Sequence, residues 1–308
     1  MRAAAQRIVF LLLAAVMTVA AVKISPVREA ALEKPVNYVY QGYAAATDAP
    51  WDESSLDFAV YRFSHLLETY FTGDYRCFLS VIPDKAQFTQ PPEDYVPADA
   101  SDTLDYLAQR LPVTAIDIAG LLSLEDYYRT DSHWRQESLV PVAQALAAGM
   151  SISLPDDTDD TLTALEGDFC GSFWGKTAEE LTPDTLAFLT NAVLDRCTVY
   201  DYETGETVGI YDYEAAKTAP YDLFLSGNKS LLRIDDPAAE TDRTLIVFRD
   251  SFGSSLLPLL APAYATIYVV DIRYLATDGL SRVVEFPDSA DVLLLYSATV
   301  LHNSITLK

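Results

Sequence analysis

The sequence predicts an α/β fold in which helices cover both faces of a mostly parallel sheet. Near the C-terminus lie three short, almost wholly apolar runs, RTLIVF (243–248), ATIYVVD (265–271) and DVLLLY (291–296). Strands that are buried on both faces have such continuous apolar runs, whereas strands with one exposed face alternate. Segments with helical spacing separate the runs, and this alternation of strand and helix is typical of a parallel sheet.

The elements before these runs are predicted from spacing and from flanking residues. Apolar side chains recur at helical spacing between residues 54 and 71, which indicates a helix. The run CFLSVIP (77–83) is typical of a buried strand that ends at its proline. Further along the chain we expect a helix at 103–111, a strand at 113–118 and another helix at 184–194.

The clearest unit is the strand 245–248 followed directly by the helix 252–260, with Ser251 at the corner between them. Together with the next strand it forms a βαβ unit, which is right-handed by default. Pro258 and Pro262 are expected to end the helix early. Ligands of open α/β sheets bind at the carboxyl ends of the strands, and Ser251 lies at such an end.

Composition and charge exclude several classes of function. The chain has 308 residues, 50% of them hydrophobic, and a net charge of −24. A nucleic acid would need a basic footprint, and none is visible, so we expect no nucleic-acid partner. The same charge makes a polyanionic substrate less favourable than a neutral one. We predict neither a metal nor a cofactor, because the acidic stretch PDDTDD (155–160) lacks the EF-hand pattern and no cysteine pair has zinc spacing.

The N-terminus indicates export. Arg2 and Arg7 precede an apolar run at residues 8–22, which suits a signal-peptide core and is short for a spanning helix. Positive charge before the run keeps that end in the cytoplasm, so the rest of the chain is expected outside the membrane, either secreted or anchored. We expect a signal peptide or N-terminal membrane anchor at 1–22, a linker or wrapping arm at 23–50 and one folded domain at 51–308.

Three cysteines, Cys77, Cys170 and Cys197, are spread along the chain. In an exported protein two of them could form a disulfide. Cys170 and Cys197 are favoured because they are nearest in sequence, but spacing alone does not fix the pairing.

A serine hydroxyl needs a base before it can act as a nucleophile at neutral pH. The chain offers three histidines. His65 lies within a predicted helix, where a structural role is favoured, and His302 has no nearby carboxylate in the sequence. His133 follows Asp131 by two residues, so the carboxylate can reach the imidazole Nδ1–H and leave Nε2 free to face a hydroxyl. The alternative is that Asp131 merely caps the following helix.

Two motifs together resemble those of the DHHW family, an SGNH-hydrolase-like group that includes the alginate O-acetylation proteins. The first motif is Thr-Asp-x-His-Trp at residues 130–134, and the second is a basic residue followed by Asp-Ser-Phe at 249–252. Ser132 stands where the family has its name-giving, non-catalytic histidine. The resemblance continues through FLSGNKSLLRI (224–234) and IYVVDIRY (267–274) and covers roughly residues 70 to 300.

The resemblance implies an SGNH-hydrolase-like three-layer α/β/α sandwich and a catalytic domain at 51–308. It implies Ser251 as nucleophile, His133 as base and Asp131 as the group that orients the base. The first N–H groups of the helix after Ser251 would stabilise an oxyanion. Further oxyanion or substrate-binding candidates are Gly227, Asn228, Trp134 and Arg249. Asp271, Arg273 and Tyr274 either shape the pocket or lock the sheet edge, and the second role is favoured.

The implied function is extracytoplasmic O-acetylation of a cell-envelope or secreted polysaccharide. The acetyl source would be a membrane-bound O-acyltransferase partner. A carbohydrate esterase or deacetylase with the same triad remains an alternative, since the two differ only in what accepts the acyl group. The other alternative is a non-catalytic glycan-binding envelope protein. Trp174, in GSFWGK (171–176), either stacks on a sugar or packs in the core, and the core role is favoured.

Overall fold

The structure, a computed structural model, describes residues 35–155 and 160–308. The predicted signal peptide or anchor at 1–22 lies outside the described residues, as do residues 23–34 of the predicted arm. The chain divides into two units, Met1–Val36 and Asn37–Lys308, and the fold described below is that of the second unit.

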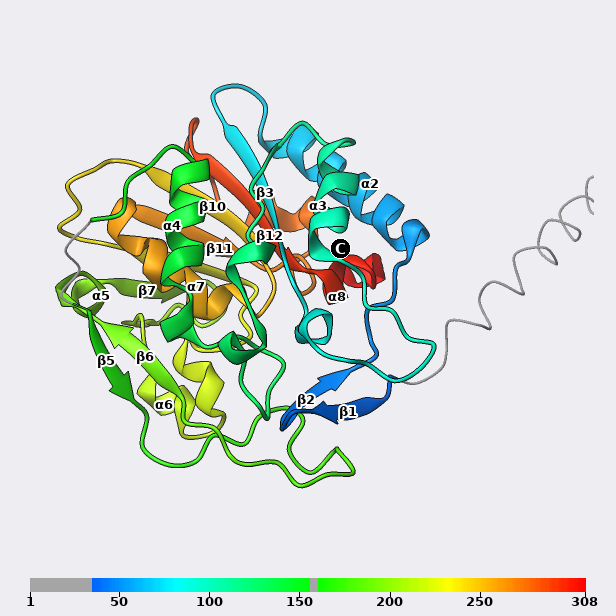
Figure 1. Ribbon diagram of the computed structural model, residues 1–308. Helices are drawn as coiled ribbons and strands as arrows, with labels where there is room; N and C mark the ends of the chain where they lie inside the picture. The colour runs from blue at the N-terminus through cyan, green and yellow to red at the C-terminus, as the bar shows by residue number, and fades with distance from the viewer. Residues whose placement is uncertain (1–34, 156–159) are drawn as a thin grey trace, which may run out of the picture. The chain divides into compact units, whose positions relative to one another are not determined.

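The centre of the unit is an eight-stranded sheet with the order β4-β3-β12-β10-β11-β9-β7-β8 (Figure 1). Pairing is parallel from β4 through β3, β12 and β10 to β11, and antiparallel where β9, β7 and β8 complete one edge. The fold is therefore mixed α/β with a large, mostly parallel sheet, as predicted. The strands of this sheet are β3 (Arg76–Ile82), β4 (Thr114–Ala115), β7 (Thr198–Asp201), β8 (Thr207–Gly209), β9 (Leu231–Asp235), β10 (Thr244–Arg249), β11 (Thr266–Val270) and β12 (Asp291–Ser297).

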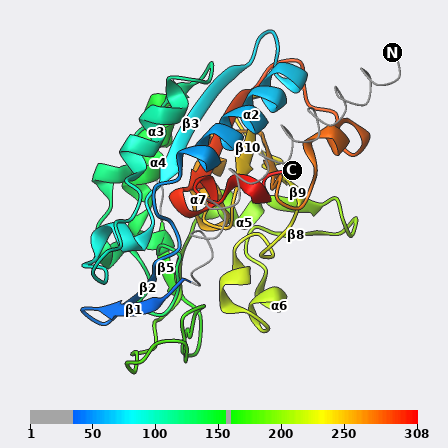
Figure 2. The same ribbon diagram turned by 90° about the vertical axis from the view of Figure 1, so that its right-hand side faces the viewer.

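Both faces of the sheet are buried, each beneath its own hydrophobic cluster. Along β10, Leu245 and Val247 belong to one cluster, whereas Ile246 and Phe248 belong to the other. Helices α4 (Val140–Gly149) and α7 (Gly253–Leu260) contribute to the first cluster, and α2 (Glu53–Tyr70) and α8 (Ala298–Leu301) contribute to the second (Figure 2). Burial on both sides explains why the central strands contain runs of consecutive apolar residues, such as 245–248 in β10 and 292–296 in β12.

The predicted βαβ unit is present as β10, α7 and β11, with parallel pairing of the two strands. The expectation that Pro258 ends the helix is wrong, because Pro258 lies inside α7 and the helix continues to Leu260. A proline removes one helical hydrogen bond, and in this short helix the fully buried packing of α7 offsets that loss. A 3₁₀ turn at Ala261–Ala263 follows and contains Pro262.

Helices α2 and α3 (Ala100–Ala108) begin close to where the sequence predicts helices. Asp52 caps α2 by accepting from the N–H of Ser55, and Asp99 caps α3 by accepting from the N–H groups of Ser101 and Asp102. Carboxylates at these positions satisfy amide groups that have no partner within the helix, so each cap fixes where its helix starts.

The predicted helix at 184–194 is wrong. Residues Ala187–Thr190 form strand β6, which pairs antiparallel with β5 (Thr161–Ala164), and only Ala192–Arg196 form a helix, α5, capped by Asn191. A short apolar run suits a strand or a helix equally well, and here pairing with a strand far away in sequence decides. The remaining elements are β1 (Asn37–Tyr40), β2 (Tyr43–Ala46) and α6 (Tyr213–Ala216).

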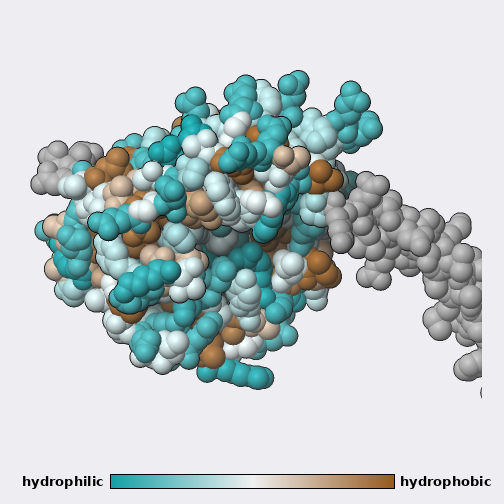
Figure 3. Space-filling view, turned by 90° about the horizontal axis from the view of Figure 1, so that it is seen from below, coloured by the Kyte–Doolittle hydropathy of each residue, from teal (hydrophilic) through white to brown (hydrophobic). Residues whose placement is uncertain are grey.

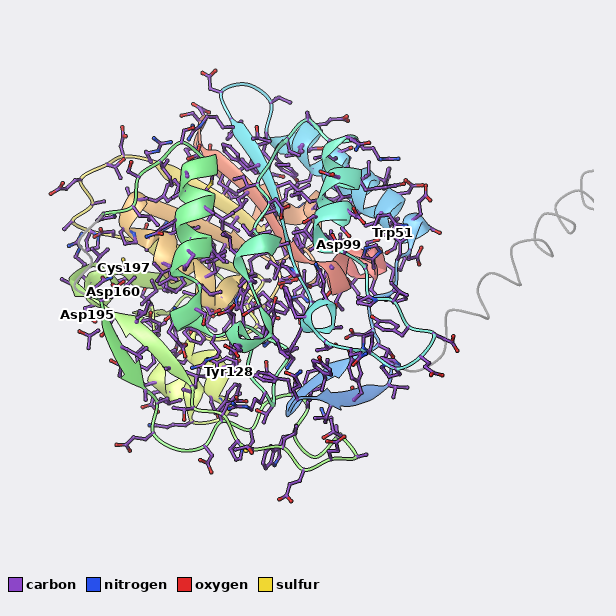
Figure 4. The ribbon with its side chains drawn as sticks, viewed as in Figure 1. Trp51, Asp99, Tyr128, Asp160, Asp195 and Cys197 are labelled. Carbon is purple, nitrogen blue, oxygen red and sulfur yellow. The ribbon has the colours of Figure 1, made fainter. Side chains whose placement is uncertain are left out.

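All three cysteines are free, so the favoured Cys170–Cys197 disulfide is not formed. Cys197 is buried beside α5, near Asp195 (Figure 4), whereas Cys170 is exposed. Strand β6 and helix α5 lie between the two cysteines in the chain, and they leave Cys170 at the surface and Cys197 in the interior. Within residues 35–155 and 160–308, no helix has the length and apolar character needed to cross a membrane.

Candidate active site

Ser251 lies in the turn that joins β10 to α7, at the carboxyl end of a central strand. The preceding residue, Asp250, is buried and fixes this turn with both carboxylate oxygens. Its Oδ1 accepts from the N–H of Phe252 at 3.0 Å, and its Oδ2 accepts from the N–H of Ser297 at 2.7 Å. Because Ser297 ends β12, Asp250 ties the serine turn to the neighbouring strand.

The structure brings Asp131, His133 and Ser251 together, as the sequence predicts. His133 Nε2 lies 2.8 Å from Ser251 Oγ, and His133 Nδ1 lies 2.5 Å from Asp131 Oδ1. The same oxygen of Asp131 accepts from the backbone N–H of His133 at 2.9 Å. Asp131 therefore does not cap a helix, which was the alternative interpretation; it holds the histidine instead.

The ionisation of Asp131 determines which ring nitrogen of His133 carries a proton. Burial alone would raise the pKa of Asp131, but the imidazole of His133 and the backbone N–H groups of His133 and Ser172 outweigh burial and hold that pKa well below its usual range. An ionised carboxylate only accepts hydrogen bonds, so Nδ1 of His133 carries a proton and donates it to Asp131. In the neutral imidazole, Nε2 is then the acceptor for the Ser251 hydroxyl.

Two aromatic rings hold the imidazole in this orientation. Tyr221 stacks on His133 with ring centroids 4.0 Å apart and an interplanar angle of 17°, and Phe252 lies on it at 4.8 Å. The Tyr221 hydroxyl in turn forms a hydrogen bond of 3.0 Å with Ser255 Oγ on α7. Rotation of the histidine would break these ring contacts, so the ring is positioned before substrate arrives.

Trp134 attaches the histidine loop to α7. Its indole N–H lies 3.0 Å from both the carbonyl oxygen of Phe252 and Ser255 Oγ, and the side chain is fully buried. Trp134 does not line the pocket beside Ser251. It contributes to the site by fixing the distance between the loop that carries His133 and the helix that follows Ser251.

Asp184, which the sequence analysis did not single out, anchors the same loop. Its carboxylate accepts from the N–H groups of Arg129 and Thr130 at 2.9 and 2.8 Å, and from the Thr130 hydroxyl at 2.6 Å. Because the sequence predicts a helix at 184–194, it gives no reason to single out Asp184 as an anchor. The only signal in the sequence is the Pro-Asp pair at 183–184, which is typical of a turn.

Lys85 and Gly171 are two further residues that the sequence analysis missed. Lys85 Nζ donates to the carbonyl oxygens of Tyr128 and Asp131 at 2.7 and 2.5 Å, and burial lowers its pKa to about 7 against the opposing effect of Asp131. A Cβ on Gly171 would lie 2.3 Å from Asp131 Cβ, so only glycine permits this approach. Neither requirement has a sequence pattern of its own.

A pocket of about 190 Å³ adjoins Ser251. It is lined by residues at the end of β2 and just after it, after β3, from the loops near His133, from the serine turn and from the segments at the ends of β11 and β12. The molecule seen from the side of β1 and β2 is largely hydrophilic, with apolar residues scattered over it (Figure 3). The hairpin β1–β2 lies within the arm predicted at 23–50, and the N–H of Ala44 donates to the carbonyl oxygen of Arg129 at 2.8 Å.

The backbone donors near Ser251 are largely engaged. The N–H of Phe252 bonds Asp250 Oδ1, that of Gly253 bonds the Asp250 carbonyl oxygen, and that of Ser254 bonds the Ser251 carbonyl oxygen. For the N–H of Ser251 itself the structure records no acceptor within the described ranges. The N–H groups at the start of the helix, which were expected to face an oxyanion, are thus bonded within the protein, and the N–H of Ser251 is the donor in this turn without a recorded acceptor among the described residues.

The other predicted oxyanion or substrate-binding residues lie apart from the pocket. Gly227 has a φ of +76° and packs on Asp222, and Asn228 is exposed. Neither lines the pocket beside Ser251, nor does Arg249, which is fully buried. Arg249 Nη1 lies 3.2 Å from the Asp250 carbonyl oxygen.

The cluster at the end of β11 locks the sheet edge. Arg273 donates to both carboxylate oxygens of Asp271, at 2.9 and 2.6 Å, and Arg249 Nη1 lies 3.9 Å from the same carboxylate. Asp271 is fully buried, Tyr274 is exposed, and Arg273 also lines the pocket. The favoured locking role therefore fits Asp271, and Arg273 combines that role with a place in the pocket wall.

The other two histidines lie elsewhere. His65 Nε2 is 3.1 Å from Asp278 Oδ1 at the surface, and His302 is buried, with its Nδ1 accepting from the N–H of Asp52 at 2.9 Å. The preference for a core role of Trp174 is wrong, because its side chain is 40% exposed.

The chain is similar to known proteins in structure rather than in sequence. No protein-family model matches it, and no curated protein matches it. Among solved structures, a DHHW family protein from Eubacterium siraeum is 21% identical, with a TM-score of 0.68 over 86% of this chain and 91% of that one. Bacillus cereus PatB1, solved with a sulfonyl adduct, is 18% identical, with a TM-score of 0.66 over 87% and 96%. The O-acetyltransferase domain of Pseudomonas putida AlgJ is 14% identical, with a TM-score of 0.49 over 87% and 93%.

These likenesses establish the fold. The chain shares its α/β architecture, over most of its length, with a DHHW family structure and with PatB1. The resemblance indicated by the two motifs is thereby confirmed at the level of the fold.

Proposed function

We propose that the chain is an extracytoplasmic O-acetyltransferase of the DHHW family that modifies a cell-envelope or secreted polysaccharide. The observation that carries this proposal is the hydrogen-bonded chain from Asp131 through His133 to Ser251, at the carboxyl end of a central strand. The domain at 51–308 would be an SGNH-hydrolase-like three-layer α/β/α sandwich. The two clusters on opposite sheet faces support that architecture.

In the first half-reaction, Ser251 Oγ attacks the carbonyl carbon of the acetyl donor. The Ser251 proton passes to His133 Nε2, and the resulting imidazolium is stabilised by the ionised Asp131. The negative charge that develops on the carbonyl oxygen is met by the N–H of Ser251 and by the N-terminal end of α7. The donor's leaving group departs with the proton from His133, and the acetyl group remains as an ester on Ser251.

In the second half-reaction, a sugar hydroxyl takes the place of the leaving group. His133 Nε2 accepts the hydroxyl proton while the sugar oxygen attacks the acetyl carbon. The bond to Ser251 breaks, Ser251 regains a proton from His133, and the O-acetylated sugar leaves. Water in the same position would give acetate instead, which is the esterase reaction.

The proposed source of the acetyl group rests on the resemblance of the two motifs to those of the DHHW family. A membrane-bound O-acyltransferase would deliver the acetyl group to the outer side of the membrane. The basic and apolar segment at 1–22, as a signal peptide or anchor, would bring the domain to that side. Of the arm predicted at 23–50, residues 37–50 belong to the folded unit, and the part before them would connect the N-terminal segment to it.

The test separates transfer from hydrolysis. The purified domain is incubated with a small activated acetyl ester, with and without neutral oligosaccharides, and both acetate and O-acetylated sugar are measured. We expect the sugar product to form at the expense of acetate, and Ser251→Ala to lower both rates about a thousandfold or more. Acetate alone, together with removal of acetyl groups from an acetylated glycan, would indicate the esterase. Equal, low rates for the wild type and Ser251→Ala would contradict catalysis and favour the glycan-binding alternative.

A further inference from the structure

The pocket beside Ser251 has an acidic wall that the triad does not use. Asp48 follows β2 and Asp84 follows β3, and both line this pocket together with Ser251. Asp84 is 8% exposed, and its Oδ2 has no hydrogen-bond partner among the residues that the structure describes. A buried, unpartnered carboxyl oxygen is costly, so a ligand group that bonds to it would be stabilised.

The other charged groups of the pocket are already committed. Lys85 donates to two backbone carbonyl oxygens, Asp250 accepts from two backbone N–H groups, and Arg273 donates two bonds to the carboxylate of Asp271. Their hydrogen-bonding capacity is directed into the protein. Asp84 is also bonded to Thr299, so the spare capacity for a bound molecule lies with Asp84 Oδ2, in a pocket that Asp48 lines as well.

Burial raises the pKa of both carboxyls. Burial, and then the nearby charge of Asp48, raise the pKa of Asp84 to about 8. At neutral pH Asp84 therefore keeps its proton and can both donate and accept a hydrogen bond. A sugar hydroxyl, which also donates and accepts, matches such a pair, and an ammonium group is attracted by it. A second carboxylate brought into the pocket would meet like charge at short range.

We propose that this pocket is the acceptor subsite, and that Asp48 and Asp84 make it select neutral or amino-sugar acceptors over uronic-acid acceptors. This inference rests on the proposed transferase function and names its substrate class. The net charge of −24 acts in the same direction at long range. The acidic pair adds a local, residue-specific cause that substitutions can test.

The experiment compares oligosaccharides of equal length: a neutral glucan, an amino-sugar oligomer and a uronic-acid oligomer. With an acetyl donor present, kcat/KM is measured for each acceptor at one ionic strength. We expect the wild type to favour the neutral and amino-sugar chains about tenfold or more over the uronic-acid chain. Asp48→Asn, which removes a charge from the pocket, is expected to reduce that ratio severalfold. Asp84→Asn replaces a protonated carboxyl by a neutral amide and should leave the ratio nearly unchanged, whereas Asp84→Leu, which removes the hydrogen-bonding group, should lower kcat/KM for all three chains. The matched control is Glu68→Gln at an exposed position of α2. It changes the net charge as Asp48→Asn does, and its ratio should equal that of the wild type.

A second readout keeps the subsite distinct from the chemistry. Equilibrium binding of the same oligosaccharides is measured on Ser251→Ala without any donor, with and without Asp48→Asn. One outcome separates the two proposals. If the wild type forms no acyl-enzyme with the donor, but binding to Ser251→Ala prefers the neutral and amino-sugar chains and Asp48→Asn weakens that preference, the transferase proposal fails and the subsite stands. A wild type that prefers uronic-acid chains would overturn the inference. A correctly folded Asp48→Asn variant that leaves the ratio unchanged in both readouts would overturn it equally.

Discussion

Asp131 determines which nitrogen of His133 carries the proton. In Asp131→Asn the amide no longer stabilises an imidazolium, and its N–H₂ group favours the wrong tautomer. We expect the rate of ester cleavage to fall about a thousandfold to ten-thousandfold, with little change in secondary structure. Initial rates with an activated acetyl ester, alongside circular dichroism, give this result. Glu125→Gln, at an exposed position, is the control; a fall of less than tenfold for Asp131→Asn would mean that Asp131 does not orient the base.

Gly171 controls the position of Asp131 through space rather than through chemistry. A methyl group there would lie 2.3 Å from Asp131 Cβ, so Gly171→Ala has to displace the carboxylate. We expect kcat to fall about tenfold to a hundredfold, because small misplacements of catalytic groups are costly. The control is Gly120→Ala, where nothing lies within 4 Å of the added Cβ. If the two variants had equal kcat, the close packing at Gly171 would have no bearing on the site.

At the scale of elements, the loop 128–134 depends on contacts from three separate segments. Asp184 holds its start, Lys85 holds two of its carbonyl oxygens, and Trp134 attaches its end to α7. The loop has little regular secondary structure of its own, so these contacts determine where His133 lies. A change at any anchor is expected to affect activity and stability together.

Asp184→Asn tests this dependence. The amide keeps one acceptor oxygen but replaces the other by a donor, which opposes the N–H of either Arg129 or Thr130, since these two groups bond different oxygens of Asp184. We expect a loss of about 2 kcal/mol in the free energy of unfolding and a lower Tm, with reduced activity at temperatures below that Tm. Thermal unfolding and initial rates measure both. Asp168→Asn, an exposed neighbour, should behave like the wild type; if Asp184→Asn did so too, the anchor would be unnecessary.

The central strands, α2, α3 and the βαβ unit were predictable because their signals are local: apolar runs, helical spacing and capping carboxylates. The proximity of Asp131, His133 and Ser251 could be expected because Asp131 and His133 are two residues apart and the two motifs resemble those of the DHHW family. Asp184, Lys85 and Gly171 were not, because each is defined by a contact across the fold. The strand at Ala187–Thr190 was not predicted for the same reason, because only its pairing with β5 distinguishes it from a helix.

At the scale of the whole molecule, the C-terminal segment around His302 packs back onto α2. His302 accepts from the N–H of Asp52, the cap of α2, and its other ring nitrogen lies 3.0 Å from Thr103 Oγ1 on α3. Burial lowers the pKa of His302 from its ordinary value of 6.5 to about 4. One buried histidine thus connects three elements that are remote in sequence.

This shift predicts how stability depends on pH. Between about pH 6.5 and 4 the unfolded chain binds a proton on His302 that the folded chain excludes, so stability falls as pH falls through this window. Above about pH 6.5, His302 is neutral in the folded and the unfolded chain, so it no longer makes stability depend on pH. His302→Gln should flatten the fall by on the order of 2 kcal/mol after allowance for solvent screening. Denaturant unfolding at several pH values measures this, with His65→Gln as the control; an unchanged slope for His302→Gln would contradict the prediction.

The central claim is that Ser251 carries the acyl group. The most direct measurement is mass spectrometry of the intact domain and of its peptides after brief exposure to an activated acetyl ester, with rapid acid quenching. The account predicts one acetyl group per chain, located on the peptide that contains Ser251, absent from Ser251→Ala and strongly reduced in His133→Ala. An acetyl group on a different residue, or equal labelling of the wild type and Ser251→Ala, would contradict it.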